Sequence, residues 1–240
     1  MARVALVTGG TRGIGAEISK TLKAQGRTVV ASYAGNDEAA RAFANETGLK
    51  VMRFDVSDLA QCQEAVRQIA SELGPVEILV NNAGITRDGT LQRMTREMWD
   101  QVIDTNLGSC FNMCKVTWDG MREKKFGRIV NVGSVNGQAG QYGQVNYAAA
   151  KSGIHGFTKA LAQEGARFGI TVNAIAPGYV DTEMVRAVPA DVLQKIVARI
   201  PVGRLGRTGD IARGVAFLTA DDADFITGST LSINGGQHMY

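Results

Sequence analysis

The chain has 240 residues, enough for one sizeable α/β domain with a buried core. Its 26 basic and 23 acidic residues leave a net charge of +3, an excess too small to indicate nucleic-acid binding, although it suits an anionic small ligand. No stretch approaches the roughly 20 apolar residues of a membrane span, and the first residues enter a strand pattern, so we expect neither a membrane segment nor a signal peptide.

Short β-branched apolar runs alternate with longer helical patterns along the chain. The predicted strands are residues 4–8, 28–32, 51–54, 78–81, 128–132, 171–176 and 230–233. The predicted helices are residues 14–24, 38–47, 59–72, 97–105 and onward, 147–168 and 210–220. Near-continuous Val/Ile/Leu runs are typical of parallel strands, and this alternation predicts a Rossmann-type, doubly wound parallel sheet. No repeat or linker divides residues 1–240, so we expect a single α/β domain.

The segment over residues 178–209 breaks the alternation of strands and helices. It follows a predicted strand and contains Pro189 and a helical pattern over residues 192–200. Long excursions of this kind are frequently functional. We therefore interpret residues 178–209 as a lid over the site.

A glycine-rich turn follows the first predicted strand and opens the first predicted helix. Glycines permit a tight turn and let the backbone approach a pyrophosphate, while the helix amino terminus supplies N–H donors. An ordinary strand–helix connection is the alternative, but the position after the first strand favours a dinucleotide site. The residues expected to bind the dinucleotide here are Gly9, Thr11, Arg12, Gly13, Ile14 and Gly15.

The end of the second predicted strand favours NADPH over NADH. An acidic residue there would hydrogen-bond the adenosine ribose and repel a 2′-phosphate. This strand ends at Ser32, which we expect to contact the cofactor, and no acid follows until Asp37, which we interpret as a helix-capping residue. Arg12 offers the opposite charge, so we predict NADPH as the reductant and NADP⁺ as its oxidised form.

The ends of the third and fourth predicted strands supply further cofactor contacts. Asp55 and Val56 end the third strand, where a carboxylate can accept a hydrogen bond from the adenine amino group. A helix N-cap is the alternative role for Asp55. Asn82, Ala83 and Gly84 end the fourth strand, where small residues would let the nucleotide lie against the strand tip.

Tyr147 and Lys151 lie four residues apart and share one face of a predicted helix. An ammonium near a phenol favours the phenolate, so we expect Lys151 to lower the pKa of Tyr147 toward neutrality. A tyrosine needs such a shift to act as a general acid or base. The spacing alone is common, so an ordinary surface helix is the alternative.

The three cysteines, Cys62, Cys110 and Cys114, are odd in number and widely placed, which indicates reduced thiols in a cytoplasmic protein. Cys110 and Cys114 have the spacing of metal ligands on a helix. No histidine or acid lies at a helpful spacing, so we expect buried packing and no metal site. His155 and His238 are interpreted as structural or surface residues.

Taken in order, these motifs resemble the short-chain dehydrogenase/reductase family over the full chain. The matching pieces are residues 8–15 and 81–84, Asn106, Ser134, Tyr147 with Lys151, and Pro177 with Gly178. One departure is Gly133, which stands where a second serine is common. The resemblance implies a Rossmann fold and the catalytic set Asn106, Ser134, Tyr147 and Lys151.

The resemblance implies a role for each of these residues. Tyr147 would give a proton to a carbonyl oxygen as hydride arrives from the nicotinamide, and Ser134 would hydrogen-bond that oxygen. Lys151 would bind nicotinamide-ribose hydroxyls, and Asn106 would hold a water in the proton relay. The residues implied to contact the nicotinamide half of the cofactor are Tyr147, Lys151, Pro177, Gly178, Val180 and Thr182.

Within the family, the chain is most similar to the acetoacetyl-CoA reductases of polyhydroxybutyrate biosynthesis, over residues 82–88, 134–138, 140–147, 155–164 and 234–239. This likeness implies NADPH-dependent reduction of a short-chain 3-oxoacyl thioester, acetoacetyl-CoA to (R)-3-hydroxybutyryl-CoA, by a cytoplasmic homotetramer. Apolar residues on the outer positions of helix 147–168 also favour burial against a partner subunit. The expected substrate contacts are Asp88, Arg93, Ser134, Gln141, Gln144 and Tyr179.

The main alternative is a 3-oxoacyl-(acyl-carrier-protein) reductase of fatty acid synthesis, because an acidic carrier requires a basic docking face. We expect Phe168, at a position where such reductases often carry a basic residue, to favour CoA instead. A non-catalytic NADPH-binding sensor on the same fold is a remote alternative, which the complete catalytic set argues against. The residues expected to offer positive charge beside the site are Arg122, Lys124, Lys125 and Arg128.

Overall fold

The computed structural model describes residues 2–186 and 188–239. Within these residues, seven parallel strands form one sheet in the order β3-β2-β1-β4-β5-β6-β7. The strands are β1 (Val4–Val7), β2 (Thr28–Tyr33), β3 (Lys50–Arg53), β4 (Val76–Asn81), β5 (Gly127–Val132), β6 (Ile170–Pro177) and β7 (Thr230–Ile233). The strand order reverses between β1 and β4, which is the point where open α/β sheets bind ligands. The predicted doubly wound parallel sheet is confirmed.

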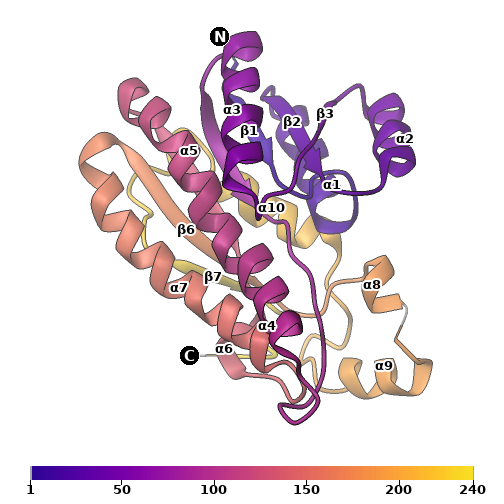
Figure 1. Ribbon diagram of the computed structural model, residues 1–240. Coiled ribbons are helices and arrows are strands. Elements are labelled where there is room, and N and C mark those ends of the chain that lie inside the picture. The colour runs from indigo at the N-terminus through magenta and orange to yellow at the C-terminus, as the bar shows by residue number, and fades with distance from the viewer. Residues whose placement is uncertain (1, 187, 240) are drawn as a thin grey trace.

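Helices cover both faces of the sheet (Figure 1). They are α1 (Gly13–Ala24), α2 (Asp37–Thr47), α3 (Leu59–Leu73), α4 (Arg96–Ile103), α5 (Ser109–Lys124), α6 (Val135–Ala139), α7 (Val145–Gly165), α8 (Glu183–Arg186), α9 (Ala190–Val197) and α10 (Thr208–Leu218). In Figure 1, α3, α5 and α7 lie in front of the sheet, and α10 lies behind it against α1.

The strands read as continuous apolar runs because both of their faces are buried. Successive side chains of a strand point to opposite faces, so Leu6 packs in one apolar cluster and Val7 in the other. Helix α1 buries Ile18 and Leu22, which lie one turn apart on the face toward the second cluster. The periodicities of strand and helix therefore agree with the packing of this sheet.

Two helix boundaries differ from those predicted. The helix predicted to begin at residue 97 continues from α4 through a π-helical turn, Asp104–Gly108, into α5. The helix predicted over residues 147–168 begins at Val145 and ends at Gly165, followed by a 3₁₀ turn, Ala166–Phe168. Local residue patterns do not distinguish these turns from α-helix. The turns differ from α-helix only in how many residues separate the N–H and C=O groups of each hydrogen bond.

The expected helix cap at Asp37 is wrong, and so is the alternative role of Asp55 as a helix cap. The N-cap of α2 is Asn36, whose side chain accepts a hydrogen bond from the N–H of Ala39 at 2.9 Å, while Asp37 is the first helical residue. The N-cap of α3 is Asp58, and Asp55 instead accepts from the backbone N–H of Ser57 at 2.8 Å. Both caps fall on the residue just outside the helix, where the side chain reaches the free N–H groups.

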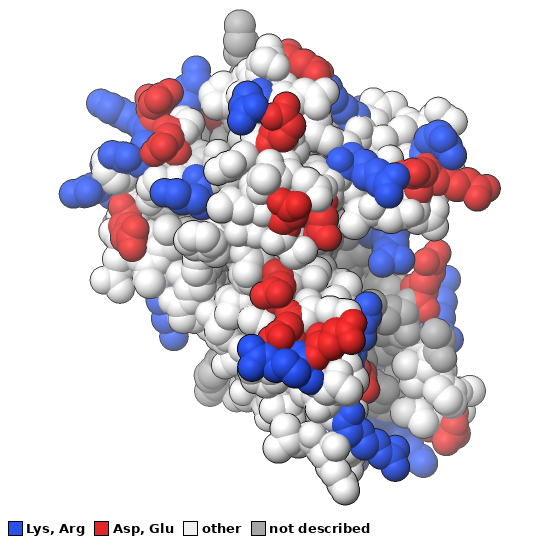
Figure 2. All heavy atoms as spheres, viewed as in Figure 1, with Lys and Arg blue, Asp and Glu red and all other residues white. Residues whose placement is uncertain are grey.

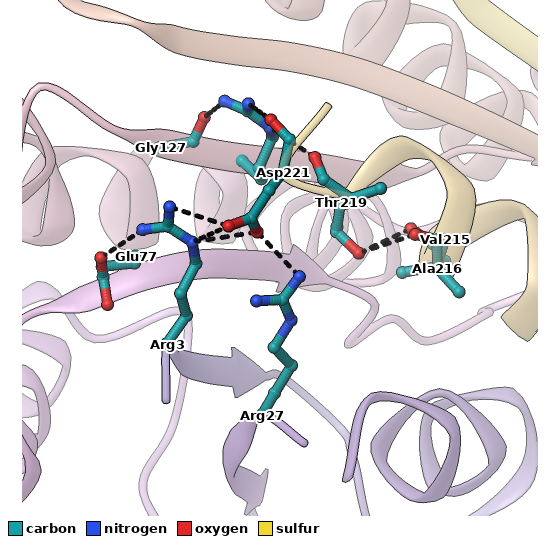
Figure 3. A network of polar contacts seen from close by, with 10 residues as sticks. Arg3, Arg27, Glu77, Gly127, Val215, Ala216, Thr219 and Asp221 are labelled. Carbon is teal, nitrogen blue, oxygen red and sulfur yellow. Dashed lines mark hydrogen bonds and ion pairs between the residues drawn. The ribbon is translucent and has the colours of Figure 1, made fainter. Parts of the chain in front are cut away.

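Three arginines form a network of ion pairs and hydrogen bonds at the amino-terminal edge of the sheet (Figure 3). Arg3 pairs with Glu77 at 2.7 Å and with Asp221 at 3.0 Å, and Arg27 pairs with Asp221 at 2.8 Å. Arg128, only 2% exposed, donates to the backbone oxygen of Asp221 at 2.9 Å. The network joins the first residues of β4 and β5 to the end of α10.

The basic residues expected beside the site lie elsewhere in the structure. Arg122 and Lys124 are in the last turn of α5, and Lys125 is two residues before β5, so all three lie at the amino-terminal edge of the sheet. Figure 2 shows basic side chains interleaved with acidic ones at this end of α5, at the upper left. Arg128 is buried, donates to the backbone oxygen of Asp221 and offers no charge to a docking partner.

No helix among residues 2–186 and 188–239 combines the length and apolar character that crossing a lipid bilayer requires.

Candidate active site

The residues predicted to be catalytic meet at the carboxyl-terminal edge of the sheet. Ser134 follows β5 and is the N-cap of α6, where its Oγ accepts a hydrogen bond from the backbone N–H of Asn136 at 3.1 Å. Tyr147 and Lys151 occupy the first two turns of α7, with Lys151 Nζ 5.7 Å from the centre of the Tyr147 ring. The Ser134 hydroxyl hydrogen-bonds the phenol oxygen of Tyr147. Three elements thus place a hydroxyl, a phenol and an ammonium in one group.

Burial governs the protonation of Tyr147. Desolvation raises the pKa of Tyr147 above its ordinary value of 10.0, while the hydrogen bond from Ser134 acts to lower it. The charge of Asp88 and the phenol of Tyr179 raise it further. The expectation that this pKa is lowered toward neutrality is wrong for this structure, because burial is the largest cause of the shift and raises the pKa. Tyr147 therefore keeps its proton at neutral pH.

Lys151 is 4% exposed, and burial lowers its pKa from 10.5 to about 8. Its Nζ donates to the backbone oxygen of Val132 at 2.7 Å, at the end of β5. The ammonium is thus directed at the strand end rather than at the phenol of Tyr147, and at neutral pH it still carries a charge inside the protein.

Asn106 lies in the π-helical turn between α4 and α5, a feature that often occurs at functional sites. Its side-chain amide donates to the backbone oxygens of Ile85 at 2.9 Å and Val102 at 2.8 Å. A Cβ atom on Gly84 would lie 2.5 Å from Asn106 Oδ1 and 3.5 Å from Lys151 Nζ. The absence of a side chain at Gly84 therefore lets the strand end approach the catalytic group.

The glycine-rich turn after β1 forms a backbone cradle. Gly9 and Gly13 have φ values of 60° and 53°, in the left-handed region that favours glycine. A Cβ atom on Gly15 would lie 2.2 Å from the backbone oxygen of Gly9. No other residue type fits this close approach, so Gly15 lets the turn close tightly on itself, as the first turn of a dinucleotide-binding fold requires.

The end of β4 holds this cradle in place. The Thr8 hydroxyl accepts hydrogen bonds from the backbone N–H groups of Asn82 and Ala83, each at 3.0 Å. The side-chain amide of Asn82 donates to the backbone oxygens of Thr8 at 2.9 Å and Gly9 at 3.1 Å. Asn82 and Ala83 are thus tied to the glycine turn.

The polar groups near the end of β2 also fit a dinucleotide. The hydroxyl of Ser32 is buried with no hydrogen-bond partner among the described residues. Arg12 is exposed and forms no ion pair within residues 2–186 and 188–239. Asp37 pairs with Arg53 at 3.1 Å, so the nearest acid after β2 is already neutralised. A free hydroxyl and a free guanidinium fit an anionic ligand group.

The other residues predicted to contact the cofactor lie along the same edge of the sheet. They are Thr11 and Ile14 in the glycine turn and the start of α1, Asp55 and Val56 after β3, and Pro177, Gly178, Val180 and Thr182 at and after the end of β6. Val180 is buried, and a Cβ atom on Gly13 would lie 3.8 Å from the side chain of Thr182. The segment after β6 therefore lies beside the glycine turn.

The structure brings together four of the residues predicted to contact the substrate. Gln144 Nε2 donates to Asp88 Oδ2 at 2.9 Å, and Tyr179 lies near enough to Tyr147 to affect its pKa, as Ser134 does. Two others are not joined to this group: Gln141 and Arg93 are exposed, and neither side chain forms a hydrogen bond to the other described residues.

Two asparagines that the sequence analysis missed organise the site. The buried amide of Asn146 donates to the backbone oxygens of Arg87 and Met98, at 3.0 and 3.1 Å, and its oxygen accepts from the N–H of Tyr147 at 2.8 Å. Asn136 bonds both Ser134 and the side chain of Gln144. The available signal was an amide side chain close in sequence to each of two predicted catalytic residues: Asn146 directly precedes Tyr147, and Asn136 lies two residues after Ser134.

The cysteines pack in the core, as predicted. All three are buried and free. Burial raises the pKa of Cys62 to about 12 and that of Cys110 to about 11. His155 is half-buried, with Nδ1 3.1 Å from the hydroxyl of Thr230, so the structural interpretation of this histidine holds.

A parallel sheet with a glycine-rich first turn of the dinucleotide-binding kind, and with a protonated tyrosine beside a serine and a lysine, is typical of nucleotide-dependent oxidoreductases. Residues 9–238 match the sequence family described as "Enoyl-(Acyl carrier protein) reductase", a group of short-chain dehydrogenases/reductases. The chain belongs to the short-chain dehydrogenase/reductase family. It is an oxidoreductase of a kind that uses a nicotinamide cofactor.

Similar proteins are found over the whole chain. An acetoacetyl-CoA reductase of Rhizobium meliloti is 61% identical, with 100% of both chains covered. An acetoacetyl-CoA reductase of Shinella zoogloeoides is 60% identical, with 99% of both covered. The 3-oxoacyl-(acyl-carrier-protein) reductase FabG of Escherichia coli is 47% identical, over 99% of this chain and 98% of its own.

Proposed function

We propose that this chain is an NADPH-dependent reductase of short-chain 3-oxoacyl thioesters. Acetoacetyl-CoA is the substrate and (R)-3-hydroxybutyryl-CoA the product, in the synthesis of polyhydroxybutyrate. The observation that carries the proposal is the pairing of a protonated Tyr147 with Ser134 beside a dinucleotide cradle. Similarity to the reductases of Rhizobium meliloti and Shinella zoogloeoides, at 61% and 60% identity, supports the CoA thioester.

The residues of the site suit proton donation to a ketone. The nicotinamide supplies a hydride to the carbonyl carbon when it is bound. The Ser134 hydroxyl donates a hydrogen bond to the carbonyl oxygen, where negative charge develops, and Tyr147 transfers its proton to that oxygen. Lys151 would hold the nicotinamide ribose, and Asn106 would hold a water through which Tyr147 regains its proton.

NADPH is supported by charge at the end of β2. Arg12 and Ser32 would receive the 2′-phosphate, since both have free polar groups. Asp37 does not oppose the phosphate, because Arg53 pairs with it at 3.1 Å. The pyrophosphate would lie on Gly9, Gly13 and Gly15, and the adenine near Asp55.

Residues 178–209 form the lid of the proposed site. This segment carries α8 and α9, which Figure 1 draws at the lower right, outside the helical layers of the sheet. Helix α9 buries none of its eight residues. The acyl chain would lie between this lid and Gln141, with Tyr179 closing over it and Arg93 facing the CoA arm.

We further propose a cytoplasmic homotetramer. Three buried, unpaired thiols support a reducing compartment. Large apolar side chains on the surface support a subunit interface: Phe111 on α5 is 54% exposed, Phe217 on α10 is 56% exposed, and Phe225 is 101% exposed. Sedimentation at micromolar concentration measures the oligomeric state, and a monomer there would contradict this part of the proposal.

Turnover with a substrate panel tests the activity. We expect acetoacetyl-CoA to be reduced with a higher kcat/KM than the same acyl group on acyl carrier protein, and NADPH to be preferred to NADH. Faster turnover of the carrier-bound substrate would favour the alternative, a reductase of fatty acid synthesis.

The variant Tyr147→Phe tests the mechanism. We expect it to retain its fold and its affinity for NADPH and to lose reduction by a factor of about 100 or more, since a positioned acid typically contributes that much. Normal turnover by this variant would show that the proposed proton donor is wrong.

A further inference from the structure

A chain of three polar side chains joins Ser134 to the loop after β4. The backbone N–H of Asn136 donates to Ser134 Oγ at 3.1 Å, and Asn136 Nδ2 donates to Gln144 Oε1 at 2.9 Å. Gln144 Nε2 then donates to Asp88 Oδ2 at 2.9 Å. Asn136 and Gln144 are half-buried, and Asp88 is exposed at the outer end.

The direction of these hydrogen bonds is set by Asp88. An ionised carboxylate only accepts, so Gln144 must turn its amino group to Asp88 and its oxygen to Asn136. Asn136 must in turn present its amino group. The orientation of both amides therefore follows from one charge at the outer end of the chain.

The backbone keeps the outer end of this chain beside the start of α7. Gly89 donates its N–H to the backbone oxygen of Gly143 at 2.8 Å, and residues 89 and 144 form a parallel bridge. The amide of Asn146 also binds the backbone oxygen of Arg87 at 3.0 Å. Asp88 is thus held close enough to Tyr147 to raise the pKa of the phenol.

We propose that Asp88, Gln144 and Asn136 form a hydrogen-bond relay that positions Ser134 and holds a negative charge beside Tyr147. This inference rests on the proposed function for the identity of the carbonyl substrate. Because Ser134 Oγ accepts from the backbone at Asn136, the single hydroxyl proton of Ser134 is left to donate, to Tyr147 in this structure and to the substrate oxygen when substrate is bound. The three residues act on the reaction through Ser134 and Tyr147, and so they are positioning residues.

Reversing the relay tests its geometry. Asn136→Asp places a second carboxylate on Gln144, whose single amino group cannot serve both ends, so kcat should fall about 10-fold to 100-fold with KM changed by less than about 3-fold. In the double variant Asn136→Asp with Asp88→Asn, the Gln144 amide can rotate and reverse both side-chain hydrogen bonds, while the backbone N–H of residue 136 still donates to Ser134 Oγ. We expect the double variant to recover at least about 10-fold in kcat relative to Asn136→Asp, if that variant loses 100-fold.

Asp88→Asn alone separates charge from geometry, because the new amide oxygen still accepts from Gln144. The groups that face Tyr147 are Ser134, Tyr179 and Asp88 from neighbouring elements and Lys151 from its own helix. Removing the one negative charge among these should lower the midpoint at which the phenol titrates.

The measurement is ¹³C NMR of ring-labelled tyrosine, with the Tyr147 signal identified by its loss in Tyr147→Phe. Asp222→Asn, exposed beyond the end of α10, is the matched control and should leave the midpoint unchanged.

The proposed function and the proposed relay can be contradicted independently of each other. A wild-type chain that reduces no 3-oxoacyl thioester contradicts the proposed function, while the Tyr147 titration still tests the relay. The relay is overturned if Asp88→Asn leaves the Tyr147 midpoint unmoved, or if the double variant is no more active than Asn136→Asp. A rise in KM with kcat unchanged would assign these side chains to substrate binding instead.

Discussion

Lys151 shows how far burial can alter a single residue. It is 4% exposed, and its ammonium donates to one backbone oxygen, that of Val132. Its pKa of about 8 in the folded chain lies below the ordinary 10.5. A buried charge with so little compensation destabilises the fold, and active sites are where such strain is retained.

Lys151→Met is therefore expected to stabilise the protein while abolishing reduction. At pH 7 the lysine is charged in both folded and unfolded chains, so the variant should gain on the order of 1–3 kcal/mol in the free energy of unfolding. Between pH 8 and pH 10.5 the unfolded chain binds a proton that the folded chain lacks, so wild-type stability rises with pH. The advantage of the variant should shrink over this window.

Urea unfolding at pH 7, 8 and 9 measures the effect, with Lys115→Met on the exposed face of α5 as the control. The control should change stability by less than about 0.5 kcal/mol. A Lys151→Met protein that is less stable than the wild type at pH 7 would show that Lys151 does not destabilise the fold.

At the scale of elements, the site depends on the close approach of α6 to α7. A Cβ atom on Gly137 would lie 2.7 Å from the backbone carbon of Lys151 and 2.8 Å from its Cβ. The first residues of α6 follow Ser134 directly. The contact at Gly137 therefore sets the distance between the serine on one helix and the lysine on the other.

Gly137→Ala should separate the two helices. Overpacking of this kind destabilises by about 1–3 kcal/mol, and the shift of Ser134 relative to Lys151 should lower kcat as well. The matched control is Gly209→Ala in α10, where the nearest atom to a new Cβ is 3.9 Å away on Glu17. Thermal unfolding and kcat are measured together. Equal behaviour of the two alanine variants would contradict the role given to this contact.

Element prediction succeeded where local pattern is sufficient. Each predicted strand overlaps an observed one, because runs buried on both faces are rich in Val, Ile and Leu. The π-helical turn at Asn106 was not predicted, since it differs from α-helix only in hydrogen-bond register. The N-cap of α2 lies one residue before the predicted Asp37, within the usual uncertainty of helix ends, whereas the N-cap of α3 lies three residues after Asp55, the alternative cap.

At the scale of the whole molecule, the two edges of the sheet have different roles. The carboxyl-terminal edge holds the proposed site, and the amino-terminal edge holds the arginine network of Figure 3. In that network, Asp221 joins Arg3 at 3.0 Å and Arg27 at 2.8 Å. It thus links the beginnings of β1 and β2 with the end of α10, from opposite ends of the chain.

Asp221→Asn should weaken this link without affecting catalysis. Burial acts to raise the pKa of Asp221, but hydrogen bonds from Arg3 and Arg27 outweigh it and hold the pKa below 3.8. The stabilisation by the carboxylate is therefore present above pH 3.8 and is lost as pH falls through the lowered pKa. At pH 7 and low salt we expect a loss of about 1 kcal/mol, because the pair is partly exposed.

Urea unfolding at low and at high salt measures this loss, which salt should reduce. The kcat for reduction should equal that of the wild type. A variant that keeps its stability but loses activity would contradict the separation of the two edges.

The amino-acid sequence alone specified the class of fold and, through its resemblance to a known family, the catalytic candidates. The patterns that indicate them are local ones: apolar runs of strand length, the glycine turn from Gly9 to Gly15, and the four-residue spacing of Tyr147 and Lys151. Those patterns act over one or two turns of chain, and so they can be read without knowing the tertiary structure.

Protonation and positioning were decided only by tertiary structure. Lys151 was expected to lower the pKa of Tyr147, but burial raises it, and so does Asp88, which lies 59 positions before Tyr147 in the chain. Asp88 reaches the site because β4 and β5 are neighbours whose ends open on the same edge. Desolvation and charge act through space, and only the folded chain sets which groups share that space.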